Sequence, residues 1–110
     1  MLQGILVELL RHVGFKAASE VKLEIAPGFH PVPDVVATAG PIENPYPTKA
    51  LEVVIEILFD EDPMSRLLTK CRTYQAWGFQ QIYVVDLAAR LVFRWSEHRL
   101  EETDSTMVRR

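Results

Sequence analysis

Three charged residues lie in apolar stretches of the sequence, where a charged side chain needs a partner. Glu56 interrupts a run of apolar residues that is typical of a central strand. Asp34 directly precedes two valines, and Lys70 lies at the edge of a helical apolar stripe, one turn before Tyr74. A carboxylate in the middle of a buried strand must be paired, hydrogen-bonded or bound to a metal ion. These three residues are therefore the first candidates for chemistry.

Together the three residues have the composition of a metal site that acts on phosphate. Two carboxylates on adjacent strands could converge on one hard divalent cation, which prefers oxygen ligands. A lysine from the following helix could approach the same point and supply local positive charge. Such a site binds phosphate through the metal and orients water against phosphorus.

Each residue also has a purely structural interpretation. Glu56 could lie at a partly exposed strand end or form an ion pair with a nearby lysine or arginine. Asp34 could be a turn residue or a cap at the start of a strand. Lys70 could extend its ammonium group into water. For each residue taken singly, the sequence leaves both interpretations open.

Two helices are predicted from apolar residues at helical spacing. The first runs from about Leu2 to Val13, with Gly14 as its stop signal. The second starts at the acidic segment 60–63 and ends at Gly78. The apolar stripe of the first helix is expected to comprise Leu2, Ile5, Leu6, Leu9, Leu10 and Val13.

Five strands and the two helices give the element order αβββαββ. This order predicts a mixed β-sheet flanked by helices, in the α/β (α+β) class. We expect a single domain over residues 1–95 and a polar, frayed tail over residues 96–110. The strands are predicted at Glu20–Ile25, Val32–Thr38, Leu51–Phe59, Gln81–Asp86 and Leu91–Trp95.

The composition excludes several classes of protein. The chain has 110 residues, with 12 Lys and Arg against 15 Asp and Glu, and a formal net charge of −3. Bulk positive charge therefore does not hold it to nucleic acid. Its one cysteine, Cys71, excludes a disulfide framework. The apolar start is too short for a membrane span and lacks the features of a signal peptide, so we expect a cytoplasmic protein with no membrane partner.

From Pro33 to Asp86 the sequence resembles the Uma-type family of restriction-endonuclease-like proteins in the PD-(D/E)XK nuclease superfamily. Pro33-Asp34-Val35 resembles the family's first metal-binding aspartate, and Val54-Ile55-Glu56-Ile57-Leu58 resembles its second acidic strand. Lys70 followed by Tyr74 matches the family's helical Lys…Tyr pattern, and Gly78–Asp86 resembles the segment that leads into the next strand.

The resemblance implies a restriction-endonuclease-like core and a metal-dependent endonuclease that hydrolyses phosphodiester bonds in DNA. Asp34 and Glu56 would bind Mg²⁺ or Mn²⁺, with help from the backbone carbonyl of Ile57. Lys70 would position or activate the attacking water and steady the charge that develops on phosphate. A chain of this size covers little duplex alone, so a homodimer is a further hypothesis.

Three residues depart from the pattern of this family or its superfamily. Leu58 holds the place of a lysine that many superfamily members have, and Phe59 stands where the family commonly has serine. Arg66 replaces an acidic residue one turn before the helical lysine, and it could contact a phosphate. These departures keep open a catalytically inactive nuclease-fold module that acts as a DNA-associated or protein-interaction domain. A third hypothesis is a small interaction domain in which Glu56 only pairs with Lys70.

Overall fold

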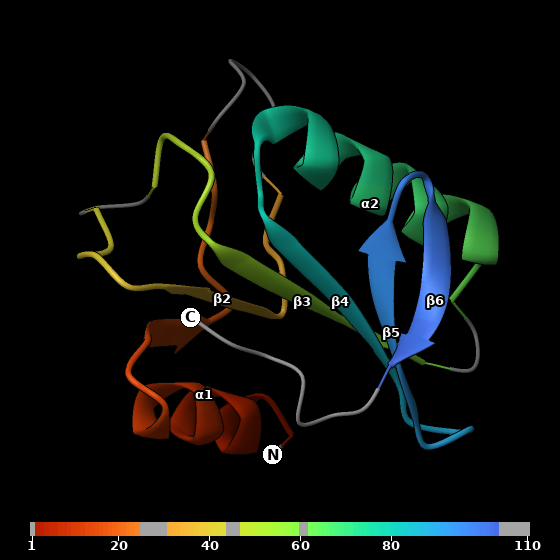
Figure 1. The fold of residues 1–110 in the computed structure, drawn as a ribbon, viewed down its shortest axis with the longest axis horizontal. Coiled ribbons are helices and arrows are strands. Elements are labelled where there is room, and N and C mark those ends of the chain that lie inside the picture. The colour runs from red at the N-terminus through yellow and green to blue at the C-terminus, as the bar shows by residue number, and fades with distance from the viewer. Residues whose placement is uncertain (1, 25–30, 44–46, 60–61, 104–110) are drawn as a thin grey trace.

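A six-stranded sheet with one helix on each face forms the protein (Figure 1). The computed structural model describes residues 2–24, 31–43, 47–59 and 62–103. In chain order the elements are α1 (Leu2–His12), β1 (Lys16–Ser19), β2 (Val35–Thr38), β3 (Val53–Leu58), α2 (Met64–Trp77), β4 (Gln81–Asp86), β5 (Leu91–Ser96) and β6 (Arg99–Thr103).

The strands lie in the sheet in the same order as in the chain, β1 to β6. All neighbours are antiparallel except β3 and β4, which are parallel and are joined by α2. A parallel pair needs a crossover connection, and here the crossover helix covers one face of the sheet. The predicted mixed sheet flanked by helices is therefore confirmed.

Side chains alternate between two apolar layers, one on each face of the sheet. The layer between α2 and the sheet contains side chains of both and consists of Leu23, Val36, Val54, Leu67, Cys71, Tyr74, Phe79, Ile82, Val84 and Trp95. The layer between α1 and the sheet likewise consists of Val7, Leu10, Phe15, Ala17, Val35, Ala37, Val53, Ile55 and Tyr83. Because successive residues of a strand point to opposite faces, Glu56 shares the α2 face with Val54.

The first helix has nearly the predicted bounds, but a different face of it is buried. Val7 and Leu10 pack on the sheet, whereas Ile5, Leu9 and Val13 are 57%, 59% and 51% exposed. The predicted stripe is therefore wrong for those three residues. This helix is apolar over more than one face, and helical spacing alone does not decide which face meets the sheet.

The first strand lies earlier in the chain than predicted. β1 ends at Ser19, and Glu20 has a left-handed φ of 53° that interrupts the strand. Residues 21–24 form no ladder, although the Leu23 N–H bonds to the Pro31 carbonyl and Leu23 is fully buried. The strand predicted at Glu20–Ile25 is therefore wrong over 20–24, because the alternation in that stretch reflects burial and not strand pairing. Ile25 and most of the predicted turn lie outside the described residues.

A sixth strand occupies part of the predicted tail. β6 pairs with β5 through the partners Trp95 and Leu100 and the partners Ser96 and Arg99. Glu97 and His98 connect them with φ values of 48° and 74°, as in a two-residue hairpin turn of the type that usually carries Asn-Gly. The expected fraying is therefore wrong for residues 99–103, and the sequence lacked the usual turn signal. Residues 104–110 lie outside the described part of the chain.

The second helix ends where the sequence predicted. Gly78 has a φ of 106°, and its N–H bonds to the carbonyls of Gln75 and Tyr74. Phe79 N–H then bonds to the Tyr74 carbonyl at 3.1 Å, which completes a left-handed helix cap.

Within the described residues, neither helix combines the length and the apolar character that crossing a membrane would require.

We predict that Gly78→Ala lowers the free energy of unfolding by about 1–2 kcal/mol, because a side chain makes the left-handed backbone unfavourable. An added Cβ would meet only the Ala50 Cβ at 3.8 Å, so the effect comes from the backbone and not from a clash. Gly4→Ala is the matched control, since Gly4 is helical and open space surrounds its added Cβ. The control should raise stability by about 0.5–1 kcal/mol in urea unfolding. Equal effects of the two substitutions would contradict this account.

Candidate active site

Asp34 and Glu56 lie in contact at the start of β2 and within the second half of β3. Glu56 Oε2 accepts a hydrogen bond from the backbone N–H of Asp34 at 3.3 Å. Asp34 Oδ2 accepts one from the backbone N–H of Ile57 at 2.7 Å. Each carboxylate is therefore bound to the backbone of the other strand, which holds two groups of like charge side by side.

The proline before Asp34 affects the hydrogen bonding of one backbone carbonyl of β3, that of Ile57. Val35 pairs with Ile55, and the same register continued by two residues places Pro33 opposite Ile57. Proline has no N–H, so position 33 donates nothing to the Ile57 carbonyl. That carbonyl lies on the same side of the strand as the Ile57 N–H, which Asp34 binds. The Ile57 carbonyl therefore receives no bond from position 33, on the edge of β3 that Asp34 binds.

The second helix completes the surroundings of Glu56. Lys70 Nζ lies 3.1 Å from Glu56 Oε1, and the Tyr74 hydroxyl donates to Glu56 Oε2 at 3.2 Å. Lys70 and Tyr74 are four residues apart, so they occupy one face of the helix in successive turns. The Glu56 side chain is 5% exposed and the Lys70 side chain 45% exposed, so the ion pair has one buried and one accessible end.

Burial dominates the electrostatics of this cluster. Desolvation raises the pKa of Glu56, and the Lys70 ammonium opposes that rise by favouring the carboxylate. Burial and the neighbouring Glu56 carboxylate raise the pKa of Tyr74, so its hydroxyl keeps its proton and acts as a donor. Burial likewise raises the pKa of the Cys71 thiol to about 11, since Cys71 is fully buried in the apolar layer between α2 and the sheet.

A small cavity of about 70 Å³ opens beside the Glu56–Lys70 pair. It lies between the end of β3 and the first two turns of α2. Its lining residues are Glu56, Ile57, Leu58, Asp62, Pro63, Arg66, Leu67 and Lys70.

The donor set fits a magnesium-type ion, with few protein ligands. Within residues 2–24, 31–43, 47–59 and 62–103, no three His, Cys, Asp or Glu side chains form a group that could hold a metal. Two carboxylates and the Ile57 carbonyl are all hard oxygen donors, and Mg²⁺ usually keeps several waters and binds through one or two carboxylates. Asp34 Oδ1 has no hydrogen-bond partner among the described residues. Every buried side-chain oxygen in that part of the chain has a partner, so Asp34 Oδ1 is not buried. That oxygen is therefore open to water or to a cation.

The structure brings the three predicted site residues, Asp34, Glu56 and Lys70, into one network of contacts. Their catalytic and metal-binding roles stay predictions. Tyr74 was predicted as part of the family's Lys…Tyr pattern, and its hydrogen bond to Glu56 was not predicted. The spacing of four residues from Lys70 was the available signal.

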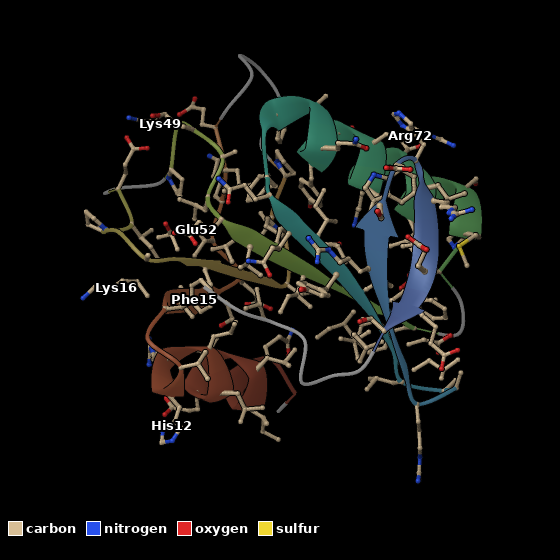
Figure 2. All side chains as sticks on the ribbon, in the orientation of Figure 1. His12, Phe15, Lys16, Lys49, Glu52 and Arg72 are labelled. Carbon is tan, nitrogen blue, oxygen red and sulfur yellow. The ribbon has the colours of Figure 1, made fainter. Side chains whose placement is uncertain are left out.

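Figure 2 shows His12 on the outer side of α1, on the face of the sheet opposite to α2.

We predict that Lys70→Met lowers the free energy of unfolding by about 1–2 kcal/mol, because it leaves the buried Glu56 carboxylate without its cation. The half-exposed lysine keeps the effect below that of a fully buried pair. Lys16→Met is the matched control, since Lys16 is exposed at the start of β1, and it should change stability by less than about 0.5 kcal/mol. In a Glu56→Gln background Lys70→Met should have little effect. Equal losses in both backgrounds would show that the ion pair is not the cause.

Comparison with solved structures finds the same fold in two other proteins. A crystal structure described as "a putative nuclease belonging to DUF820" from Anabaena variabilis superposes with a TM-score of 0.74 at 20% sequence identity, over 94% of this chain and 65% of that one. A cryoEM structure of a DrdV–DNA complex superposes with a TM-score of 0.59 at 15% identity, over 94% of this chain and 9% of that one. The chain therefore spans about two thirds of the length of the Anabaena structure.

Sequence comparison identifies the family. No curated protein matches the chain. A family model described as "Uma2: Putative restriction endonuclease" matches residues 2–108, which is nearly the whole chain. The match includes Asp34, Glu56 and Lys70, and it agrees with the resemblance seen in the sequence. The chain belongs to the Uma2 family of "putative restriction endonucleases".

Proposed function

We propose that this chain is a metal-dependent endonuclease domain that hydrolyses phosphodiester bonds in DNA. The observation that carries the proposal is the direct contact of Asp34 with Glu56, and of Glu56 with Lys70, at the edge of a cavity. Phosphodiester hydrolysis needs an activated water and a stabiliser for the charge that develops on phosphate.

Asp34, Glu56 and the Ile57 carbonyl would hold Mg²⁺ or Mn²⁺. When bound, such an ion polarises a phosphoryl oxygen and lowers the pKa of a water molecule. Lys70, half exposed beside Glu56, would stabilise negative charge on the phosphate oxygens. Tyr74 donates to Glu56 and fixes the carboxylate orientation, so it acts as a positioning residue.

DNA is the proposed substrate because the family is described by the name restriction endonuclease and the DrdV neighbour is a complex with DNA. The DNA in that structure is bound by DrdV and not by this chain. It supports the choice of DNA as the first substrate to test. The net charge of −3 means that any contact with DNA depends on local groups at the site.

We predict that the purified protein nicks plasmid DNA with Mg²⁺ or Mn²⁺ and not with EDTA. Asp34→Ala and Glu56→Ala should each lower the rate by at least about 100-fold, since each removes a charge that acts on the transition state. Nicking is followed on agarose gels as conversion of supercoiled to relaxed plasmid.

Glu8→Ala is the matched control for the loss of one acidic residue. Glu8 is exposed on α1 and pairs with Arg11 at 3.3 Å, on the opposite face of the sheet from the site. The control should keep wild-type activity. Nicking that survives both Asp34→Ala and Glu56→Ala would refute the proposed site.

One observation favours a second function, a nuclease-fold module without activity. Both oxygens of Glu56 already accept hydrogen bonds, from Lys70 on one side and from Tyr74 and the Asp34 N–H on the other. A carboxylate satisfied in this way can be purely structural. Such a module would act as a DNA-associated or protein-interaction domain.

Metal binding separates the two functions. We predict that isothermal titration calorimetry detects binding of Mn²⁺ at millimolar concentration or below, and that Asp34→Asn abolishes it because the amide loses the charge of the carboxylate. Asp62→Asn is the control, since Asp62 also lies near the cavity but its carboxylate binds the Phe59 N–H at 2.9 Å. Absence of both binding and nicking in the wild type would favour the inactive module.

A further inference from the structure

Arg66 lies in the cavity but takes no part in the network around Glu56. Pro63, Arg66, Leu67 and Lys70 all line the cavity and follow one another at spacings of three, one and three residues along α2. This spacing places them on one face of the helix, toward the end of β3. Arg66 and Lys70 lie four residues apart, about one helical turn, which is about 6 Å along the axis.

The other charged groups in the cavity are already engaged. Lys70 is neutralised by Glu56 at 3.1 Å, and the Asp62 carboxylate accepts a hydrogen bond from the Phe59 N–H. Arg66 has no side-chain hydrogen bond and no ion pair with any residue that the structure describes, Asp62 included. Its guanidinium therefore keeps all five N–H donors available in a concave part of the surface.

A free guanidinium beside a phosphate-hydrolysing site has a specific chemical use. Its planar fork matches two oxygens of one phosphate group and forms two parallel charge-assisted hydrogen bonds. The chain as a whole carries a charge of −3, so a polyanion is held only where a cation is locally uncompensated. Among the residues that the structure describes, Arg66 meets that condition at the cavity without an acidic partner, whereas Lys70 shares its charge with Glu56.

We propose that Arg66 binds a phosphate of the DNA backbone next to the phosphodiester that is hydrolysed. The proposal rests on the proposed nuclease function and adds a substrate-binding residue to it. The contact is to phosphate and not to a base, so it contributes affinity without sequence preference.

Salt dependence of DNA binding tests this contact directly. A short fluorescein-labelled DNA duplex is titrated with protein by fluorescence anisotropy between about 50 and 200 mM salt, in EDTA and again in Ca²⁺, and gels verify that the duplex stays intact. Removal of one phosphate contact lowers the slope of log K against log salt by about 0.9. We expect Arg66→Ala to show this change together with roughly tenfold weaker binding at the lowest salt.

Two variants distinguish a phosphate contact from other effects of the substitution. Arg66→Lys should keep the wild-type slope, because an ammonium group also neutralises one phosphate. Arg72→Ala removes an exposed arginine from the same helix outside the cavity, and it should change neither slope nor affinity. Figure 2 shows Arg72 on the outer side of α2.

The outcomes separate this proposal from the proposed function. If the wild type nicks plasmid and binds the duplex while Arg66→Ala binds with unchanged affinity and slope, the Arg66 contact is wrong and the nuclease function stands. If Arg72→Ala changes the slope as much as Arg66→Ala, the effect is one of general charge and the proposal also fails. If the wild type neither binds nor nicks DNA, the proposed function is wrong, and the Arg66 contact falls with it.

Discussion

A carboxylate inside a sheet is stable only where donors reach it, and Glu56 receives donors from both neighbouring elements. Asp34, the residue before β2, supplies its backbone N–H, and α2 supplies the Lys70 ammonium and the Tyr74 hydroxyl. Leaving a buried polar group unsatisfied costs about 1–3 kcal/mol, and more when it is charged. The start of β2 and the orientation of α2 are therefore both constrained by one side chain on β3.

The sheet topology makes this convergence possible. β3 and β4 are parallel, so the chain must cross one face of the sheet between them, and α2 makes that crossing. A helix that lies over β3 can place two residues in successive turns over the same strand position. On the other side, β2 runs antiparallel to β3, and Pro33 ends their ladder where Asp34 begins to contact Ile57. The same break in pairing that ends the ladder creates the group of oxygen donors.

The contacts among Asp34, Glu56 and Lys70 were easier to predict from sequence than the outer parts of the fold. A charge inside an apolar run has a large energetic consequence, so Asp34, Glu56 and Lys70 stood out, and Gly78 is a strong local signal for the end of α2. The hydrogen bond of Tyr74 did not stand out, because a buried tyrosine also fits an apolar stripe. The pairing of β6 depends on a turn at Glu97 and His98, whose residue types do not favour left-handed backbone. The buried face of α1 depends on tertiary packing, which helical spacing cannot resolve when more than one face is apolar.

The two helices pack on opposite faces of the sheet (Figure 1). Among the described residues, the donors to the Glu56 carboxylate come from α2 and from Asp34 just before β2, whereas α1 packs on the other layer through Val7 and Leu10. Substitutions in α1 can therefore accumulate during evolution as long as the sheet stays covered. Under the proposed function, one surface of the sheet carries the candidate site and the other only packs against α1, so the sequences of the two surfaces can diverge at different rates.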